Sequence, residues 1–197
     1  MTTGSSCLRR WLGPLAAVAL ATGQAAAAND WGIEQLMHSL AAVQSSQATF
    51  VELKHVALLT TPLQSRGRLV YVAPGKLEKH TLSPREESLV LQGDELTVES
   101  GGRKRRLQLQ DQPVVRAFVE SIRSTLAGDL ATLRSFYAIQ LEGSERRWRL
   151  ILKPGDRQVQ EIVSEIRIVG SRDAITHIEF LETGGDRTVM TITRDGA

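Results

Sequence analysis

The sequence has almost no cysteine and few aromatic residues. It contains one cysteine in 197 residues, and Phe, Trp and Tyr together make up 5%. A single cysteine excludes an intramolecular disulfide and a cysteine-rich zinc site. A fold held together by disulfides or by zinc is therefore excluded, and a packed hydrophobic core must stabilise the chain.

Motifs for catalysis are also absent. No G-x-S-x-G elbow, phosphate-binding loop or H-E-x-x-H pair occurs. The acidic pairs, Glu86 with Glu87 and Glu161 with Glu165, are typical of solvated strand edges. We therefore expect no enzyme, no metal site and no cofactor, and a hydrolase would require a histidine beside a serine. The histidines show no metal-ligand spacing and are His38, His55, His80 and His177.

No apolar run is long enough to cross a bilayer. The run LGPLAAVALATG at residues 12–23 has about a dozen residues, where a spanning helix needs about 20. It follows Arg9 and Arg10 and precedes QAAAAND, an arrangement typical of a secretory signal peptide. We predict a signal peptide over residues 1–28, cleaved after Ala28, which removes Cys7 and sends the protein to the periplasm. Residues 29–197 are then expected to form a single domain.

Charge of one sign is not in excess either. The formal net charge of +2 comes from 24 basic and 22 acidic residues, and Arg9 and Arg10 account for the difference. Once these two arginines leave with the signal peptide, 22 basic residues face 22 acidic ones. A chain without a net positive field is not expected to bind nucleic acid.

Strand patterns dominate the rest of the chain. Apolar spacing predicts one helix from Asp30 to Val43, with Asn29 or Asp30 as its cap. From Gln47 the period changes to two, which predicts strands joined by short turns such as Pro74-Gly75 in an antiparallel meander. The predicted strands cover residues 47–59, 63–73, 76–82, 88–91, 95–99, 103–110, 137–141, 147–153, 162–169, 175–181 and 188–193.

One helical segment, residues 113–134, interrupts the meander. Gly128 is expected to end its first helix, and Asp129 to cap a shorter second one. Arg116 and Glu120 are predicted to pair at i, i+4. A sheet of about ten strands or more tends to curl, so the inserted helix is expected to cover its concave face in an α+β fold. The apolar face of the helix consists of Val115, Phe118, Val119, Ile122 and Leu126.

Four consecutive cations follow the predicted turn at Gly101 and Gly102. One interpretation is the polar outer face of a hairpin, and the other is a docking patch for lipid head groups or an acidic partner. Strand alternation would place at least two of the four at the concave face or its rim. These residues are Arg103, Lys104, Arg105 and Arg106.

The order of these segments resembles the LolA family of periplasmic lipoprotein carriers over nearly all of the exported chain. The matching segments are ATFVE at 48–52, GRLVYVAPGKLEKHTLSP at 67–84, ESLVLQGDELTV at 87–98 and VSEIRIVGSRDAITHIEFLE at 163–182. The resemblance implies an unclosed antiparallel β-barrel with a helical lid and a hydrophobic cavity that shields acyl chains. It also implies an inner-membrane ABC-type donor complex and an outer-membrane acceptor.

Two positions depart from the family pattern. Typical members have an arginine immediately before the hairpin proline. This arginine holds the lid closed through hydrogen bonds to the lid backbone, and this sequence has Ala73 at that position. They also tend to have an aromatic residue where this sequence has Lys79. Arg66 or Arg68 would be the candidates to replace the missing arginine.

We therefore predict a monomeric, non-enzymatic carrier of lipoproteins or related lipids. Two alternatives stay open: a carrier of a pathway-specific lipid or acyl product, and a periplasmic lipid sensor that binds a membrane partner. The residues expected to line the cavity are Phe50, Leu69, Tyr71, Leu77, Leu89 and Leu91, facing the apolar helix face from Val115 to Leu126.

Overall fold

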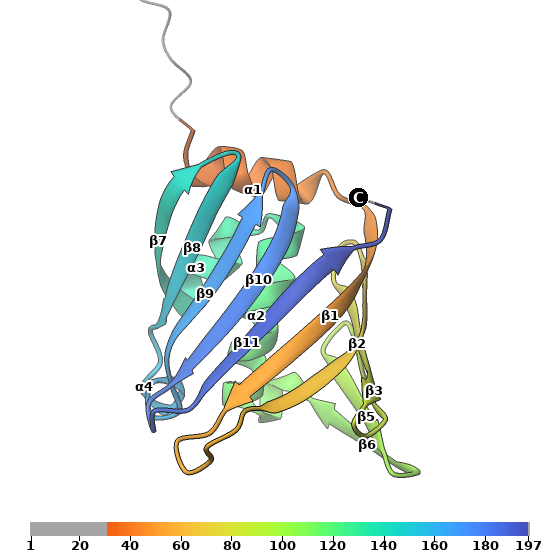
Figure 1. Ribbon diagram of the computed structural model, residues 1–197. Coiled ribbons are helices and arrows are strands. Elements are labelled where there is room, and N and C mark those ends of the chain that lie inside the picture. Colours follow the sequence, from red (N-terminus) through yellow and green to blue (C-terminus); the bar gives the residue numbers. More distant parts are fainter. Residues whose placement is uncertain (1–30, 197) are drawn as a thin grey trace, which may run out of the picture. The chain divides into compact units, whose positions relative to one another are not determined.

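The computed structural model describes residues 31–196, in which eleven strands form one antiparallel sheet (Figure 1). The predicted signal peptide lies outside the described residues. The strands are β1 (Ser45–His55), β2 (Leu63–Val72), β3 (Lys76–Ser83), β4 (Glu87–Gln92), β5 (Glu95–Ser100), β6 (Arg103–Gln108), β7 (Tyr137–Ser144), β8 (Arg147–Pro154), β9 (Val163–Ser171), β10 (Ala174–Glu182) and β11 (Arg187–Arg194). The helices are α1 (Ile33–Ala41), the short η1 (Leu109–Asp111), α2 (Pro113–Ala127), α3 (Leu130–Phe136) and α4 (Arg157–Gln160).

The sheet order explains why helices cover the concave face. The strands follow β6-β5-β4-β3-β2-β1-β11-β10-β9-β8-β7, so the first and last strands pair in the middle, while β6 and β7 are the edges. The chain between the two edge strands consists of η1, α2 and α3. Because this segment must pass from one edge to the other, it crosses the open side of the curved sheet (Figure 1). The predicted unclosed, highly curved sheet is confirmed.

Local signals account for most element ends. The helix α1 begins at Ile33, after Gly32, whose N–H donates to the Gln35 side chain at 3.0 Å. The first strand ends at His55 and not at the predicted residue 59, because a turn begins there. The four-residue helix α4 was not predicted, since one helical turn is too short to show a period.

The core lies under one half of the sheet. Trp148 on β8 is fully buried, and its indole N–H donates to the Arg172 carbonyl at 2.9 Å. A Cβ at Gly170 would lie 2.2 Å from this indole ring, so only glycine allows the approach. Strands β3 and β5 of the other half contain no fully buried residue. The buried residues of this core come mainly from α1, β8 and β9: Leu36, Met37, Leu40, Leu150, Leu152, Val163, Ile166 and Ile168.

The ends of α2 and α3 match their predicted signals. Gly128 ends α2 in the left-handed region with φ of 67°. Asp129 caps α3 by accepting from the Thr132 backbone N–H at 2.9 Å and from its hydroxyl at 2.6 Å. These donors, the Thr132 hydroxyl first, lower the pKa of Asp129.

Replacing this cap is expected to weaken the fold modestly. Asp129→Ala should lower the free energy of unfolding by about 1 kcal/mol at neutral pH, measured by urea unfolding. Because the folded state lowers the pKa of Asp129, its contribution is present above the unfolded pKa and is lost as the pH falls through the folded pKa. The gap between the two proteins should therefore shrink in acid, whereas a gap independent of pH would exclude the carboxylate as its source.

Candidate functional site

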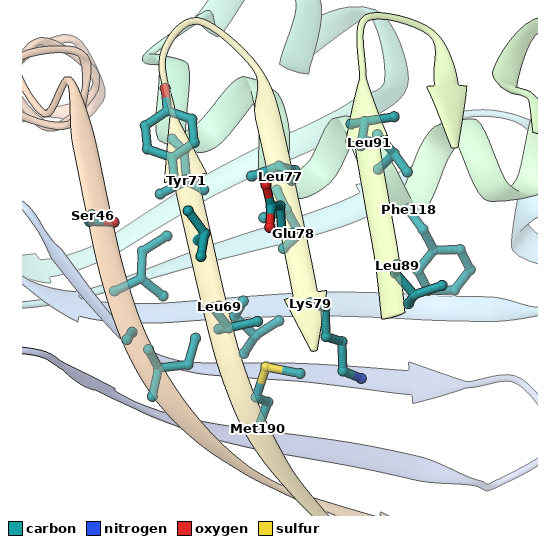
Figure 2. Close-up of a pocket in the computed structure, with 18 of the residues that line it drawn as sticks. Ser46, Leu69, Tyr71, Leu77, Glu78, Lys79, Leu89, Leu91, Phe118 and Met190 are labelled. Atoms are coloured by element: carbon teal, nitrogen blue, oxygen red, sulfur yellow. The ribbon is translucent and has the colours of Figure 1, made fainter. Parts of the chain in front are cut away.

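A cavity of about 390 Å³ lies between the concave face of the sheet and α2 (Figure 2). Its walls come from α2 and from strands of both halves of the sheet, and they are predominantly apolar. This is the composition typical of sites for small apolar ligands. The apolar lining consists of Val43, Ala48, Leu69, Val70, Tyr71, Leu77, Leu89, Leu91, Leu96, Val115, Phe118, Val119, Ile122, Leu126, Ala174, Ile175, Ile178, Phe180, Met190 and Ile192.

Strand register brings most of the predicted sheet residues together. Tyr71 pairs with Leu77, which pairs with Leu91 on the next strand. Because paired residues share a face, they line the cavity side by side with Leu69 and Leu89. Phe50, the remaining one of the six sheet residues predicted to line the cavity, is buried in the core and does not belong to the lining.

The predicted apolar face of α2 lies over this surface, and all five of its residues contact the cavity. Two contacts fix the helix in place. The rings of Phe118 and Phe180 lie 5.3 Å apart, which joins α2 to β10. Tyr137 donates its hydroxyl to the Ala117 carbonyl at 2.7 Å, and burial raises the pKa of this tyrosine.

The lining from β10 and β11 was not predicted. These residues alternate with polar neighbours, so the signal for a half-buried strand was present. Their position in the cavity depends on the pairing of β1 with β11, for example Phe50 with Ile192. No feature of chain order specifies this pairing between the two ends of the domain. The residues concerned are Ile175, Ile178, Phe180, Met190 and Ile192.

Charged side chains also belong to the lining, and they are paired. The Lys79 ammonium lies 2.7 Å from a Glu52 carboxylate oxygen and 5.1 Å from the centre of the Phe50 ring. Ser65 donates to the other Glu52 oxygen at 3.1 Å. Lys79 is therefore neutralised by Glu52 at the cavity wall. The other polar residues of the lining are Ser46, Glu78, Asp173 and Arg194, and the last two pair at 2.9 Å.

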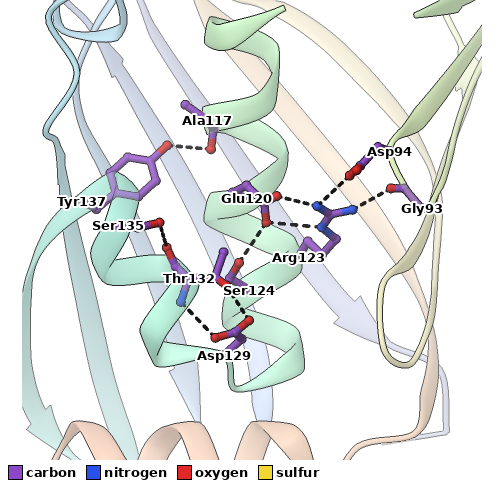
Figure 3. A network of polar contacts seen from close by, with 10 residues as sticks. All are labelled: Gly93, Asp94, Ala117, Glu120, Arg123, Ser124, Asp129, Thr132, Ser135 and Tyr137. Atoms are coloured by element: carbon purple, nitrogen blue, oxygen red, sulfur yellow. Dashed lines mark hydrogen bonds and ion pairs between the residues drawn. The ribbon is translucent and has the colours of Figure 1, made fainter. Parts of the chain in front are cut away.

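A second polar cluster joins α2 to the sheet (Figure 3). The Glu120 carboxylate is buried, with 2% of the residue exposed, and accepts from Arg123 and from the Ser124 hydroxyl. Arg123 also donates to the Gly93 carbonyl at 2.6 Å and to Asp94 at 3.2 Å, both in the turn after β4. Glu120 raises the pKa of Arg123. The helix is thus bonded to the turn through a single guanidinium group.

This cluster corrects one prediction. Glu120 pairs with Arg123 at i, i+3 and not with Arg116, which lies over the Phe136 ring at 5.4 Å. The predicted i, i+4 pair is therefore wrong.

Arg66 and Arg68 are exposed, and strand alternation directs them away from the cavity-facing Leu69. Neither arginine takes the place of the missing one before Pro74.

One histidine lies beside a serine. The Ser88 hydroxyl is 3.1 Å from His80 Nδ1, and His80 Nε2 is 2.7 Å from Glu78 Oε2. Lys76 and then His80 lower the pKa of Glu78. Acyl transfer would also need N–H donors aimed at an oxyanion, but β3 and β4 are paired on both sides and their backbone is engaged. We interpret this trio as a hydrogen-bonded row in which strand alternation directs His80 and Ser88 away from Lys79 and Leu89, whereas Glu78 also borders the cavity.

The four consecutive cations lie on the edge strand β6, and all four are exposed. Only Arg106 approaches an acidic side chain among the described residues, at 3.7 Å from Glu95. They do not belong to the cavity lining. In residues 31–196, no helix is long and apolar enough to cross a membrane, and no group of three His, Cys, Asp or Glu side chains is placed to hold a metal ion.

Several solved structures are similar to this chain. A LolA superfamily protein from Nitrosomonas europaea is 11% identical, with 83% of this chain and 92% of that chain covered and a TM-score of 0.46. The lipoprotein LppX of Mycobacterium tuberculosis is 10% identical over 84% and 93%, with a TM-score of 0.45. A chain of the MucA/MucB complex of Pseudomonas aeruginosa is 18% identical over 84% and 58%, also with 0.45. Likeness at this level supports no transfer of function.

Sequence comparison defines the family more directly. No curated protein matches the chain at a significant level. The family model described as outer membrane lipoprotein carrier protein LolA-like matches residues 25–196, which is nearly the whole sequence. This chain therefore belongs to the LolA-like outer membrane lipoprotein carrier family.

Proposed function

We propose that the protein is a non-enzymatic carrier that holds an acyl chain between the concave sheet and α2. The observation that carries this function is the apolar cavity of about 390 Å³, with walls from both the sheet and the helix. Removing each CH₂ group of an acyl chain from water is worth about 0.8 kcal/mol. A carrier needs only such a surface and no reacting group.

Family membership supports the direction of transport. We propose that the carrier works in the periplasm after removal of residues 1–28, as one domain with residues 113–134 as its lid. Its cargo would be a lipoprotein or related lipid, received from an inner-membrane ABC-type complex and passed to an outer-membrane acceptor.

A specific observation favours a second candidate, a carrier of another acyl product. The pair formed by Lys79 and Glu52 gives the cavity wall both hydrogen-bond donors and acceptors. Such a wall suits an amphiphile whose polar head lies beside this pair and whose chain fills the apolar region. Ala73 supports the same candidate, because the sequence lacks the family's arginine before Pro74.

Both candidates predict that affinity depends on chain length. Saturated fatty acids of increasing length should displace a fluorescent acyl probe with an affinity that rises roughly fourfold for each added CH₂ group. The increase should stop when the chain fills the cavity. Displacement that does not depend on chain length would contradict burial of the chain.

The two candidates differ in what the protein holds in the cell. Protein isolated from a Gram-negative periplasm should carry a triacylated peptide if the cargo is a lipoprotein. It should carry a single-chain amphiphile if the cargo is another acyl product. Mass spectrometry of the extracted ligand decides between them, and a preparation with neither ligand and no probe binding would refute both.

A further inference from the structure

Exposed leucines gather at one end of the sheet. The segment joining β1 to β2 exposes 94% of Leu58 and 50% of Leu59, and Leu63 at the start of β2 is 55% exposed. Single exposed apolar residues are common, but three within six positions form a small apolar tip. Residues 56–63 contain no charged side chain, although 23% of the chain is charged.

The structure holds this tip in place. The Leu59 N–H donates to the Val56 carbonyl at 2.9 Å, which closes a tight turn with Ala57 and Leu58 at its centre. The Ala57 N–H donates to the Asp186 carboxylate at 2.9 Å, which ties the turn to the one between β10 and β11. Gly, Asn, Asp, Ser and Pro dominate such turns. A leucine at this position satisfies no need of the turn itself, which indicates a contact outside the chain.

The basic strand β6 begins at the same end of the sheet. Successive strands from β1 to β6 run antiparallel, so the turns after β1, β3 and β5 share one end, drawn at the lower side of Figure 1. The turn at Gly101 and Gly102 leads directly into the four exposed cations. Charges on an edge strand alone would be explained as protection against edge pairing. That explanation does not cover the leucines.

We propose that this end of the molecule docks on the surface of a bilayer that contains anionic lipids. Leu58 and Leu59 insert among the acyl chains, while the cations of β6 contact the lipid head groups. An apolar tip with adjacent cations is the composition of reversible membrane anchors. Glu86 in the intervening turn and Glu87 at the start of β4 oppose the cations, so the docking is weak and salt-sensitive. Docking beside a membrane serves the proposed carrier function, but binding to vesicles does not depend on it.

The test is co-flotation of the purified protein with vesicles made of equal parts phosphatidylglycerol and phosphatidylcholine, compared with phosphatidylcholine alone. The wild-type protein should float only with the anionic vesicles, and less as salt rises. Leu58→Ser with Leu59→Ser should reduce binding about tenfold or more, since two inserted side chains are lost. Val72→Ser, which changes an exposed residue at the other end of β2, is the matched control and should bind normally.

A second set of variants tests the role of the cations in the same vesicle assay. Replacing Arg103, Lys104, Arg105 and Arg106 by glutamine should remove the preference for anionic vesicles, at roughly fivefold per charge. The matched control, Arg66→Gln with Arg68→Gln, changes two exposed cations on β2 and should leave that preference intact. Absence of wild-type flotation, or unchanged binding by the leucine variant, would overturn the proposal. Fatty acid displacement by the same variants should be normal, so failure of the docking surface is separable from failure of the cavity.

Discussion

The Arg123→Met substitution is expected to lower the free energy of unfolding by about 3 kcal/mol relative to the wild-type protein. The substitution leaves the Glu120 carboxylate, which is 2% exposed, with the Ser124 hydroxyl as its remaining side-chain partner. Breaking a buried ion pair by removing one partner costs about 3–5 kcal/mol, and the partial exposure of Arg123 places this case at the lower end. Urea unfolding at neutral pH measures the difference.

Two further variants separate the buried charge from a general effect on the helix. Arg116→Met removes an exposed arginine seven residues earlier on α2 and should cost less than about 1 kcal/mol. Glu120→Leu combined with Arg123→Met removes both charges, and should recover much of the loss because no carboxylate is left unpaired. If the double variant is as unstable as Arg123→Met alone, the buried charge is not the cause.

The same residue should control how fast ligand leaves. Arg123 bonds α2 to the Gly93 carbonyl, and its Cδ lies 2.9 Å from the position that a Cβ at Gly75 would take. In the family pattern, an arginine on the sheet reaches the lid, whereas here an arginine on the helix reaches a turn of the sheet. Both arrangements oppose separation of the helix from the sheet. Probe release from Arg123→Met should therefore be faster than from Arg116→Met.

Local patterns in the sequence predicted the elements and the apolar face of α2. Period two specified the strands, and spacing of three and four residues placed Phe118 and Ile122 on one face. Gly128 and Asp129 marked helix ends because their backbone and side-chain preferences act over a few residues. The curvature followed from the number of strands and from the helical segment between the two edges.

The parts that could not be predicted depend on contacts between distant positions. Lys79 reads as a polar residue at an aromatic position, and only the neighbouring strands show that it is neutralised by Glu52. Glu120 reads as an exposed helix residue with Arg116 as its partner at i, i+4. It is buried instead, and its partner Arg123 donates to Gly93 in the turn after β4. A charge pattern along one helix contains no information about that turn.

A Leu89→Trp variant is expected to bind acyl chains with about 3 kcal/mol less favourable free energy, which corresponds to a dissociation constant roughly 150-fold larger. Leu89 lies on β4 in the cavity wall, opposite Phe118 of the covering helix (Figure 2). An indole at this position occupies space that about four CH₂ groups would otherwise fill. Because the side chain extends into an existing cavity, the free energy of unfolding should change by less than about 1.5 kcal/mol.

The matched control is Val90→Trp, which places the same indole on the next residue of β4. Strand alternation directs Val90 to the opposite face, and it does not belong to the cavity lining. Fatty acid affinity should therefore remain within about threefold of the wild-type value, by displacement of the same probe. Equal losses in both variants would mean that the tryptophan disturbs β4 itself. Unchanged affinity in Leu89→Trp would place the acyl chain outside this cavity.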